Sequence, residues 1–306
     1  MITKTVKLFS PKVDIVFKML FGDERSVEIL IDFLKAVLNL PDDELEEVTI
    51  VDPHLLREHY TDKLGILDVK VKTRSKKIID IEIQLRLKPN FIERIIFYQS
   101  KMITEQIGAG NDYSKIQRVI SIIITDENMI EEYKGGEGKY HHRMILCDPE
   151  TGYQFTDIKE INILELKKLS KVDDGTNLWA WMKFLSTENK EELDMLVVEK
   201  PQTKIGKAVA RLEELSQDER ARMLYESRQM LEWDIKLGKE AAEKEGREEG
   251  KKEGIKEGIK EGIKEGIKEG KKESAFEIAK NLLNMGMSIA DISAATNLTS
   301  KEIETL

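Results

Sequence analysis

Cysteine is nearly absent from this chain, since Cys147 is the only one among 306 residues. A single cysteine excludes a disulfide framework and a four-cysteine zinc site within one chain, and it favours a reducing compartment. No apolar run approaches the roughly 20 residues that a membrane-spanning helix needs, and the N-terminal segment lacks the apolar core of a signal peptide. We therefore expect a cytoplasmic protein that does not enter the membrane, with Cys147 as a small buried residue.

Two further absences narrow the chemistry. No segment has the Gly-x-x-x-x-Gly-Lys-Ser/Thr spacing of a nucleotide phosphate loop, so we expect no nucleotide cofactor. Only four histidines are present, and His141 and His142 are adjacent. On a strand these two side chains point to opposite faces, which makes them a poor metal pair, and we interpret them as surface residues.

Charged residues, by contrast, are abundant. They make up 35% of the chain, against about 25% in ordinary soluble domains. The formal net charge of −9 argues against attraction of nucleic acid along the whole sequence. Residues 63–94 reverse the sign locally, with nine basic residues against four acidic ones. The basic residues are Lys63, Lys70, Lys72, Arg74, Lys76, Lys77, Arg86, Lys88 and Arg94. This stretch is where the sequence predicts a nucleic-acid partner.

Much of the surplus charge lies in residues 238–273, whose core repeats Gly-Ile-Lys-Glu every four residues. Lysine and glutamate favour a helix, but each interior glycine costs about 1 kcal/mol, so the seven glycines from Gly246 to Gly270 cost roughly 7 kcal/mol. A period of four also makes the isoleucines spiral around a helix that has 3.6 residues per turn. Two interpretations are open: a helical segment for assembly or spacing, and a solvated low-complexity linker.

Hydrophobic periodicity predicts an α/β protein with a central sheet. The predicted helices cover residues 14–21, 25–38, 91–107, 178–185, 217–245 and 275–285, and the predicted strands cover 48–52, 64–73, 77–87, 119–125, 142–147, 153–157 and 161–166. Ser288-x-x-Asp291 and Thr299-x-x-Glu302 predict two further helix starts. The C-terminal residues therefore have helix-turn-helix spacing, for which assembly is favoured over DNA recognition because the last helix is short and acidic.

Two adjacent predicted strands carry the candidate chemistry. A turn centred on Ser75 places Asp68 opposite Glu82 and Lys70 opposite Asp80, all on the even-numbered face. The odd-numbered face is apolar and consists of Leu67, Val69, Val71, Ile79, Ile81, Ile83 and Leu85. Two carboxylates on adjacent strands suit a hard divalent cation such as Mg²⁺, with Mn²⁺ or Ca²⁺ as alternatives. The competing interpretation is a cross-strand surface pair that only stabilises the sheet.

The helix that follows adds a polar face. Arg94, Tyr98 and Lys101 recur at helical spacing on one side of residues 91–107. Arg94 and Tyr98 are candidates to steady a phosphate or the groups around the carboxylates, and a solvated helix face is the alternative.

Several of these segments together resemble a known family. They are Asp14–Phe21 (DIVFKMLF), Leu67–Val69 (LDV), Ile81–Gln84 (IEIQ), Arg94-x-x-x-Tyr98 and Val119–Asp126 (VISIIITD), in this order. Over about residues 5–170 the chain resembles the recombination-promoting nucleases, also labelled PD-(D/E)xK family transposases. The resemblance implies a restriction-endonuclease-like α/β core, with a central mixed sheet flanked by helices, and Mg²⁺-dependent DNA cleavage.

The resemblance also implies roles for single residues. Asp68 and Glu82 would bind the metal ion together with the backbone carbonyl of Ile83, and Gln84 stands at the usual lysine position. Leu67 stands where the motif has proline.

Glutamine cannot act as a base, although members that this chain resembles commonly carry it at this position. The group that activates water is therefore unassigned, and Lys70, on the same face, is our candidate. Asp14 is a further acidic candidate, with a role at the start of its helix as the alternative.

We predict four parts along the chain: a nuclease-like core (1–130), an α+β extension of it (131–200), a charged helix with the repeat spacer (201–273), and a small helix-turn-helix-like module (274–306). The predicted function is a Mg²⁺-dependent endonuclease that acts on double-stranded DNA in recombination or transposition and forms homo-oligomers through residues 217–306. The alternatives are a catalytically inactive nuclease fold that binds DNA or acts as a scaffold through its C-terminal helices, and a transposase-like partner within a larger nucleoprotein complex.

Overall fold

The computed structural model describes residues 8–38, 40–55, 66–87, 89–108, 110, 112–131 and 136–306. Lys63, Lys88 and the beginning of the predicted strand 64–73 lie outside the described residues. The chain divides into two compact units, residues 1–229 and residues 230–306, and each is described by itself.

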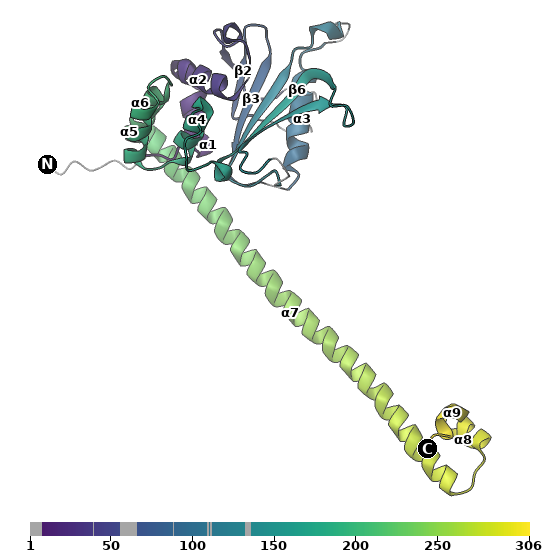
Figure 1. Ribbon diagram of the computed structural model, residues 1–306. Coiled ribbons are helices and arrows are strands. Elements are labelled where there is room, and N and C mark those ends of the chain that lie inside the picture. The colour runs from purple at the N-terminus through teal and green to yellow at the C-terminus, as the bar shows by residue number, and fades with distance from the viewer. Residues whose placement is uncertain are drawn as a thin grey trace, which may run out of the picture. The chain divides into compact units, whose positions relative to one another are not determined.

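A mixed six-stranded sheet forms the centre of the first unit (Figure 1). The strands are β1 (Thr49–Val51), β2 (Val69–Lys72), β3 (Ile78–Gln84), β4 (Val119–Thr125), β5 (His141–Cys147) and β6 (Gln154–Glu165), in the order β1-β2-β3-β4-β6-β5. The neighbours β3, β4 and β6 run parallel, and the outer pairs are antiparallel. β4 is buried along its whole length, as a near-continuous apolar run in a covered parallel sheet should be. The α/β class with a mixed sheet is confirmed.

Helices cover both faces of this sheet. On one face, odd-numbered residues of β2 and β3 share a continuous apolar core with five helices. These are α1 (Asp14–Phe21), α2 (Val27–Val37), α4 (Asn177–Ser186), α5 (Lys190–Glu199) and α6 (Ile205–Gln217). Trp181 of α4 is fully buried there, with the ring of Phe33 5.8 Å away. On the other face α3 (Phe91–Thr104) packs through Ile95 and Met102. The sequence prediction missed α5 and α6.

The edge of the sheet departs from three predictions. The two strands expected at 153–157 and 161–166 are one strand, β6, because its first half pairs with β5 across an irregular register and its second half pairs with both β5 and β4. Cys147 is exposed, because β5 is an edge strand. His142 is buried, because its ring lies against Glu165, with its Nε2 atom 3.2 Å from a carboxylate oxygen.

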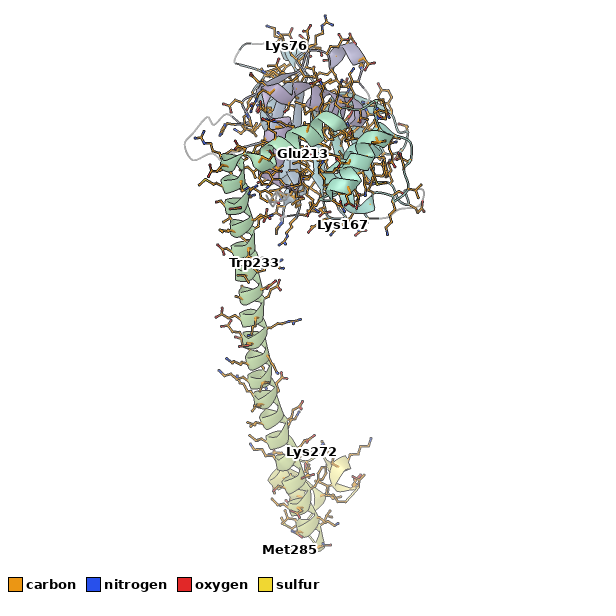
Figure 2. All side chains as sticks on the ribbon, turned by 90° about the vertical axis from the view of Figure 1, so that its left-hand side faces the viewer. Lys76, Lys167, Glu213, Trp233, Lys272 and Met285 are labelled. Carbon is orange, nitrogen blue, oxygen red and sulfur yellow. The ribbon has the colours of Figure 1, made fainter. Side chains whose placement is uncertain are left out.

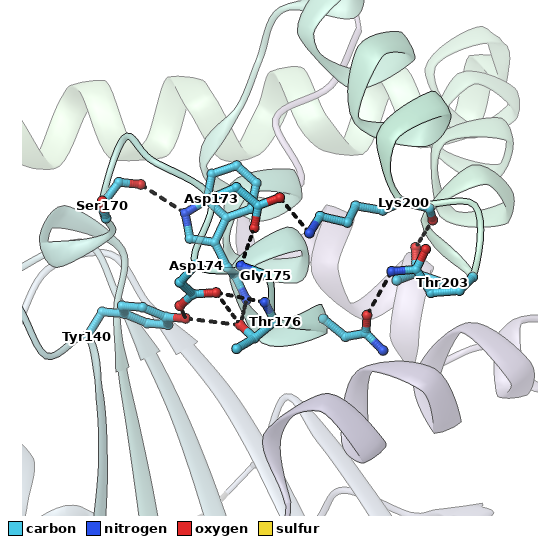
Figure 3. Close-up of polar contacts among 11 residues, drawn as sticks. Tyr140, Ser170, Asp173, Asp174, Gly175, Thr176, Lys200 and Thr203 are labelled. Atoms are coloured by element: carbon cyan, nitrogen blue, oxygen red, sulfur yellow. Dashed lines mark hydrogen bonds and ion pairs between the residues drawn. The ribbon is translucent and has the colours of Figure 1, made fainter.

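A polar loop fixes the start of α4 (Figure 3). Asp174 accepts hydrogen bonds from the Tyr140 hydroxyl, at 2.5 Å, and from the Thr176 hydroxyl, at 2.6 Å. Lys200, at the end of α5, forms an ion pair of 2.5 Å with Asp173. The loop therefore ties α4 to the residue before β5 and to the end of α5.

The turn between β2 and β3 is held by one buried carboxylate. Glu44 accepts hydrogen bonds from the backbone N–H of Ser75 at 3.1 Å, from its hydroxyl at 2.7 Å, from Lys77 Nζ at 2.7 Å and from the Thr73 hydroxyl. Lys76, at the tip of the turn (Figure 2), has a positive φ of 67°. The strand register pairs Lys70 with Asp80, which confirms the turn centred on Ser75.

Loss of the Glu44 charge should destabilise this hairpin. Burial alone would raise the pKa of Glu44, but Lys77, Thr73 and Ser75 lower it from 4.5 to about 2. Since the pKa is lower in the folded state, the stabilisation is complete above pH 4.5 and disappears as the pH falls through about 2. At about 1.4 kcal/mol per pKa unit, Glu44→Gln should lower the free energy of unfolding by about 3 kcal/mol at pH 7.

Urea unfolding at pH 7 and at pH 2 measures this difference. The matched control is Glu47→Gln, which removes an exposed carboxylate that lies 3.8 Å from Arg74 and should change stability by less than about 0.5 kcal/mol. If Glu44→Gln and the control were equally stable at pH 7, Glu44 would not hold the turn.

A single helix, α7 (Glu219–Asn284), runs through the glycine-rich repeat. It joins the helices predicted at 217–245 and 275–285, so the repeat does not interrupt the helix. The second unit ends with α8 (Ile289–Thr296) and α9 (Ser300–Ile303), which begin at the predicted capping residues Ser288 and Thr299. Within the described parts of the chain, no helix has the length and apolar character required to cross a bilayer.

Candidate functional site

Two acidic side chains lie on the face of the sheet that α3 covers, and a third carboxylate lies beside them. Asp80 and Glu82 point from β3 to this face and are only 2% and 6% exposed. The ladder between β2 and β3 ends at Val69 opposite Ile81, one residue short of Asp68 and Glu82. The charge of Asp68 acts on both Glu82 and Asp80, so the structure brings together the two carboxylates that the sequence paired.

Asp68 is positioned by contacts other than the strand ladder, because it lies in a bend just before β2 begins. One of its carboxylate oxygens accepts a hydrogen bond from the backbone N–H of Ile83 at 2.9 Å. The other oxygen lies 2.9 Å from Lys18 Nζ, which comes from α1. The bend also breaks the predicted alternation, because Leu67 packs with Ile78 on the α3 side and not in the odd-face core.

Arg94 connects α3 to the carboxylates. Its Nη2 atom lies 3.4 Å from Glu82 Oε2 and donates to Gln84 Oε1 at 2.9 Å. The guanidinium carbon is 4.8 Å from the ring centre of Phe91 and 5.9 Å from that of Tyr98. Arg94 is thus a fixed, partly buried group of the site, and the alternative of a purely solvated helix face is wrong for this residue.

Burial and mutual repulsion shift the protonation of this cluster. Burial, and then the charge of Asp68, raise the pKa of Glu82 to about 7, although Arg94 and Lys18 oppose the rise. The pKa of Asp80 is raised well above its ordinary value by burial and then by Glu82 and Asp68. Burial also raises the pKa of Tyr98. The cluster therefore has a local surplus of negative charge, which a cation would relieve.

The structure places the remaining candidates elsewhere or further out. Lys70 directs its ammonium to Glu105, at 3.2 Å, near the end of α3. Asp14 pairs with Arg228 of α7 at 2.5 Å. Lys101 is half-buried on α3. The lysine that contacts Asp68 is Lys18, while Lys70 lies opposite Asp80 and its charge opposes the rise in the pKa of Asp80.

Two members of the site escaped the sequence prediction. Lys18 lies one helical turn after Asp14, inside the segment that carried the resemblance, but nothing local shows that it reaches Asp68. Asp80 was noticed only as the partner of Lys70. The signal for Asp80 was an acidic residue between apolar residues of a strand that is buried along nearly its whole length. Acidic side chains are rarely buried at such positions unless they are paired.

In the described residues 66–87 and 89–94, the basic side chains do not all lie around the carboxylates. Arg74, Lys76 and Lys77 lie at the β2–β3 turn, and Glu82 follows Lys77 by five residue steps along the strand, a distance of about 16 Å. Lys77 is bound to Glu44, and Arg94 is bound to Glu82. The predicted electrostatic patch is therefore wrong as a single feature, because residues close in sequence end at opposite ends of one strand.

The donor set fits a magnesium-type site. Among the described residues, no group of three or more His, Cys, Asp or Glu side chains is arranged to hold a metal ion by itself. Mg²⁺ commonly takes one or two carboxylates and completes its shell with waters and substrate oxygens. Asp68 and Glu82 supply such a pair, and the charge of Asp68 acts on Glu82.

Comparison with known proteins gives one match. A family model described as "PD-(D/E)XK nuclease family transposase" matches residues 11–242, which is more than half of the chain. The matched range includes α1, the β2–β3 hairpin and α3, which together build the carboxylate cluster. No curated protein and no solved structure matches significantly.

Proposed function

Because the chain belongs to the PD-(D/E)XK nuclease family of transposases, we propose that it is a Mg²⁺-dependent endonuclease that cleaves double-stranded DNA in recombination or transposition. The observation that supports this most is the pair formed by the partly buried Asp68 and the buried Glu82, each of which contacts a cation from a different helix. A bound Mg²⁺ ion would polarise a phosphoryl oxygen and lower the pKa of a water molecule. The rest of the chemistry depends on the side chains around it.

Each neighbouring side chain has a definite task in this proposal. Asp68 and Glu82 hold the ion, with the Ile83 carbonyl as a further ligand. Arg94 orients both Glu82 and Gln84, because one guanidinium contacts the two side chains. Its position over the rings of Phe91 and Tyr98 limits its rotation. Glu82 is thus preorganised by a contact from α3, and Asp68 by Lys18 of α1 and the Ile83 N–H.

Lys18 takes the role of the lysine that the family motif has at the position of Gln84. Its ammonium lies 2.9 Å from Asp68 and its charge acts on Glu82, so a phosphate held at the carboxylates would lie within its reach. A cation at that place stabilises the negative charge that develops on the phosphate during cleavage.

Substitution of Lys18 tests this assignment. We expect Lys18→Met to lower the rate of plasmid cleavage by about 10²–10³-fold, the usual loss when one charge-stabilising donor is removed. The matched control is Lys70→Met, because Lys70 is also a lysine of the same region but pairs with Glu105. Single-turnover cleavage at saturating Mg²⁺ measures both variants. An equal loss in the two variants, or no loss in Lys18→Met, would contradict the assignment.

A second candidate function is an inactive nuclease fold that binds DNA as a scaffold. The observation in its favour is that Lys18 and the Ile83 N–H already engage both oxygens of Asp68, while Gln84 stands at the lysine position. Such a protein would bind DNA without cleaving it in any divalent metal. For either function we propose self-association through residues 217–306.

A further inference from the structure

The repeat in α7 sorts its four residue types into four separate ridges. A step of four residues advances by about 40° around a helix, so each residue type lines up above its own kind. Around the helix the order is Glu, Gly, Ile, Lys. The isoleucine ridge consists of Ile255, Ile259, Ile263 and Ile267, whose side chains are between 54% and 59% exposed.

Contacts within an isolated helix do not explain this arrangement. Each lysine of the repeat has a glutamate three residues before it, which is favourable, but it also has another lysine four residues away. Each glutamate likewise has another glutamate four residues away, so repulsion between like charges opposes the attraction. A Cβ atom added at any glycine from Gly246 to Gly270 would meet no atom within 4 Å in the described chain. Figure 2 shows the side chains of this part of α7 directed outward. The fold of a single chain therefore does not explain the glycines.

We propose that α7 binds a second copy of this chain in parallel orientation, with the isoleucine ridge of each copy seated in the glycine ridge of the other. Ridges of residues four apart pack into the matching grooves of another helix at a crossing angle of about −50°. A period above 3.6 residues winds with a right-handed twist, as this crossing requires. Glycines along the groove let the two backbones approach closely.

Charge complementarity selects both the partner and its direction. The Gly–Ile face is flanked by the Glu ridge on its glycine side and by the Lys ridge on its isoleucine side. In a parallel pair opposite flanks meet, so Glu faces Lys and Ile faces Gly. In an antiparallel pair identical flanks meet, so Lys faces Lys and Ile faces Ile. A second copy in parallel orientation therefore places each isoleucine ridge against a glycine ridge and each charged ridge against a ridge of opposite charge.

This inference specifies the surface for the proposed self-association through residues 217–306, and it does not depend on nuclease activity. The test is sedimentation equilibrium of the full chain, beside the double variant Gly258→Leu/Gly262→Leu. We expect a dimer for the original chain and a rise of at least about tenfold in the dissociation constant for the variant, although leucine favours the helix more than glycine does. The matched control is Gly238→Leu, since Gly238 also has open space around it but lies outside the repeat.

Helix content and dimer formation should change in opposite directions in the double variant, which distinguishes the proposed dimer from a solvated helix without a partner. Circular dichroism should show equal or greater helix content in the double variant, while its dimer is lost. A monomeric original chain, or a double variant that dimerises as tightly as the control, would overturn the proposal. DNA cleavage is not the readout, so an inactive nuclease would leave this result unaffected.

Disulfide cross-linking tests the orientation. In a Cys147→Ser background, Ile255→Cys should form cross-linked dimers because a parallel pair places the two residues at position 255 near each other. Glu257→Cys, on the charged flank, should cross-link at least about tenfold more slowly, since opposite flanks meet. Cross-linking at equal rates, or none at position 255 in a chain that still dimerises, would exclude the parallel arrangement.

Discussion

Asp68→Asn and Glu82→Gln should each lower the rate of Mg²⁺-dependent plasmid cleavage by at least about 10³-fold, which corresponds to about 4 kcal/mol of transition-state stabilisation. Each amide keeps the size of the side chain but removes the negative charge that a divalent cation requires. The loss should be similar in both variants because the two carboxylates are proposed to share one ion. Agarose-gel assays with Mg²⁺, and with EDTA as the metal-free reference, measure the rates.

Glu47→Gln serves as the matched control for these assays, because it removes an exposed carboxylate from the same region of the first unit. It should cleave at the rate of the original chain. Cleavage that survives Asp68→Asn or Glu82→Gln would contradict the assignment of the metal site. DNA binding without cleavage by the original chain in Mg²⁺ and Mn²⁺ would favour the inactive scaffold.

Glu82→Gln should also make the metal-free protein more stable at pH 8, by about 3 kcal/mol at about 1.4 kcal/mol per pKa unit. Burial, then the Asp68 charge, raise the pKa of Glu82 from 4.5 to about 7 in the folded state, against Arg94 and Lys18. A group with a raised folded pKa contributes stability that is fully present below pH 4.5 and is lost as the pH rises through 7. A glutamine side chain does not titrate, so the variant escapes this loss.

Urea unfolding in EDTA at pH 5 and pH 8 measures the effect. The stability of the original chain should fall between the two pH values, and Asp80, whose pKa is raised too, adds to the fall. Glu82→Gln should therefore gain over the original chain at pH 8 but little at pH 5. A variant that is less stable than the original chain at pH 8 would show that the charged Glu82 carboxylate does not destabilise the folded state.

The local pattern of the sequence was sufficient to predict the hairpin that carries the site. A symmetric turn centred on Ser75 predicted the pairing of Lys70 with Asp80, and the buried Glu44 carboxylate holds that turn. The helical spacing of Arg94 and Tyr98 likewise predicted the face that meets Glu82. These features depend on neighbours in sequence, which periodicity describes well.

Features that depend on distant contacts could not be predicted. Lys18 reaches Asp68 from a helix 50 residues earlier, and no pattern within that helix identifies its partner. The helices α5 and α6 were missed because their apolar side chains become buried through distant contacts, α5 with α4 and α6, and α6 with α1 and α2 as well. The charge of residues 63–94 did not predict a single surface, because a sum along the sequence ignores the length of strand that separates these residues in space.

Titration calorimetry with Mn²⁺ tests the central claim most directly, because it measures the metal site without requiring cleavage. At pH 7 the original chain should bind one ion at the carboxylate pair and release part of a proton, since Glu82, with a pKa of about 7, must give up its proton to bind. The heat should therefore depend on the ionisation enthalpy of the buffer, and Asp68→Asn should lose the binding. Equal binding by Asp68→Asn, or no binding by the original chain, would contradict the assignment of Asp68 and Glu82 as metal ligands.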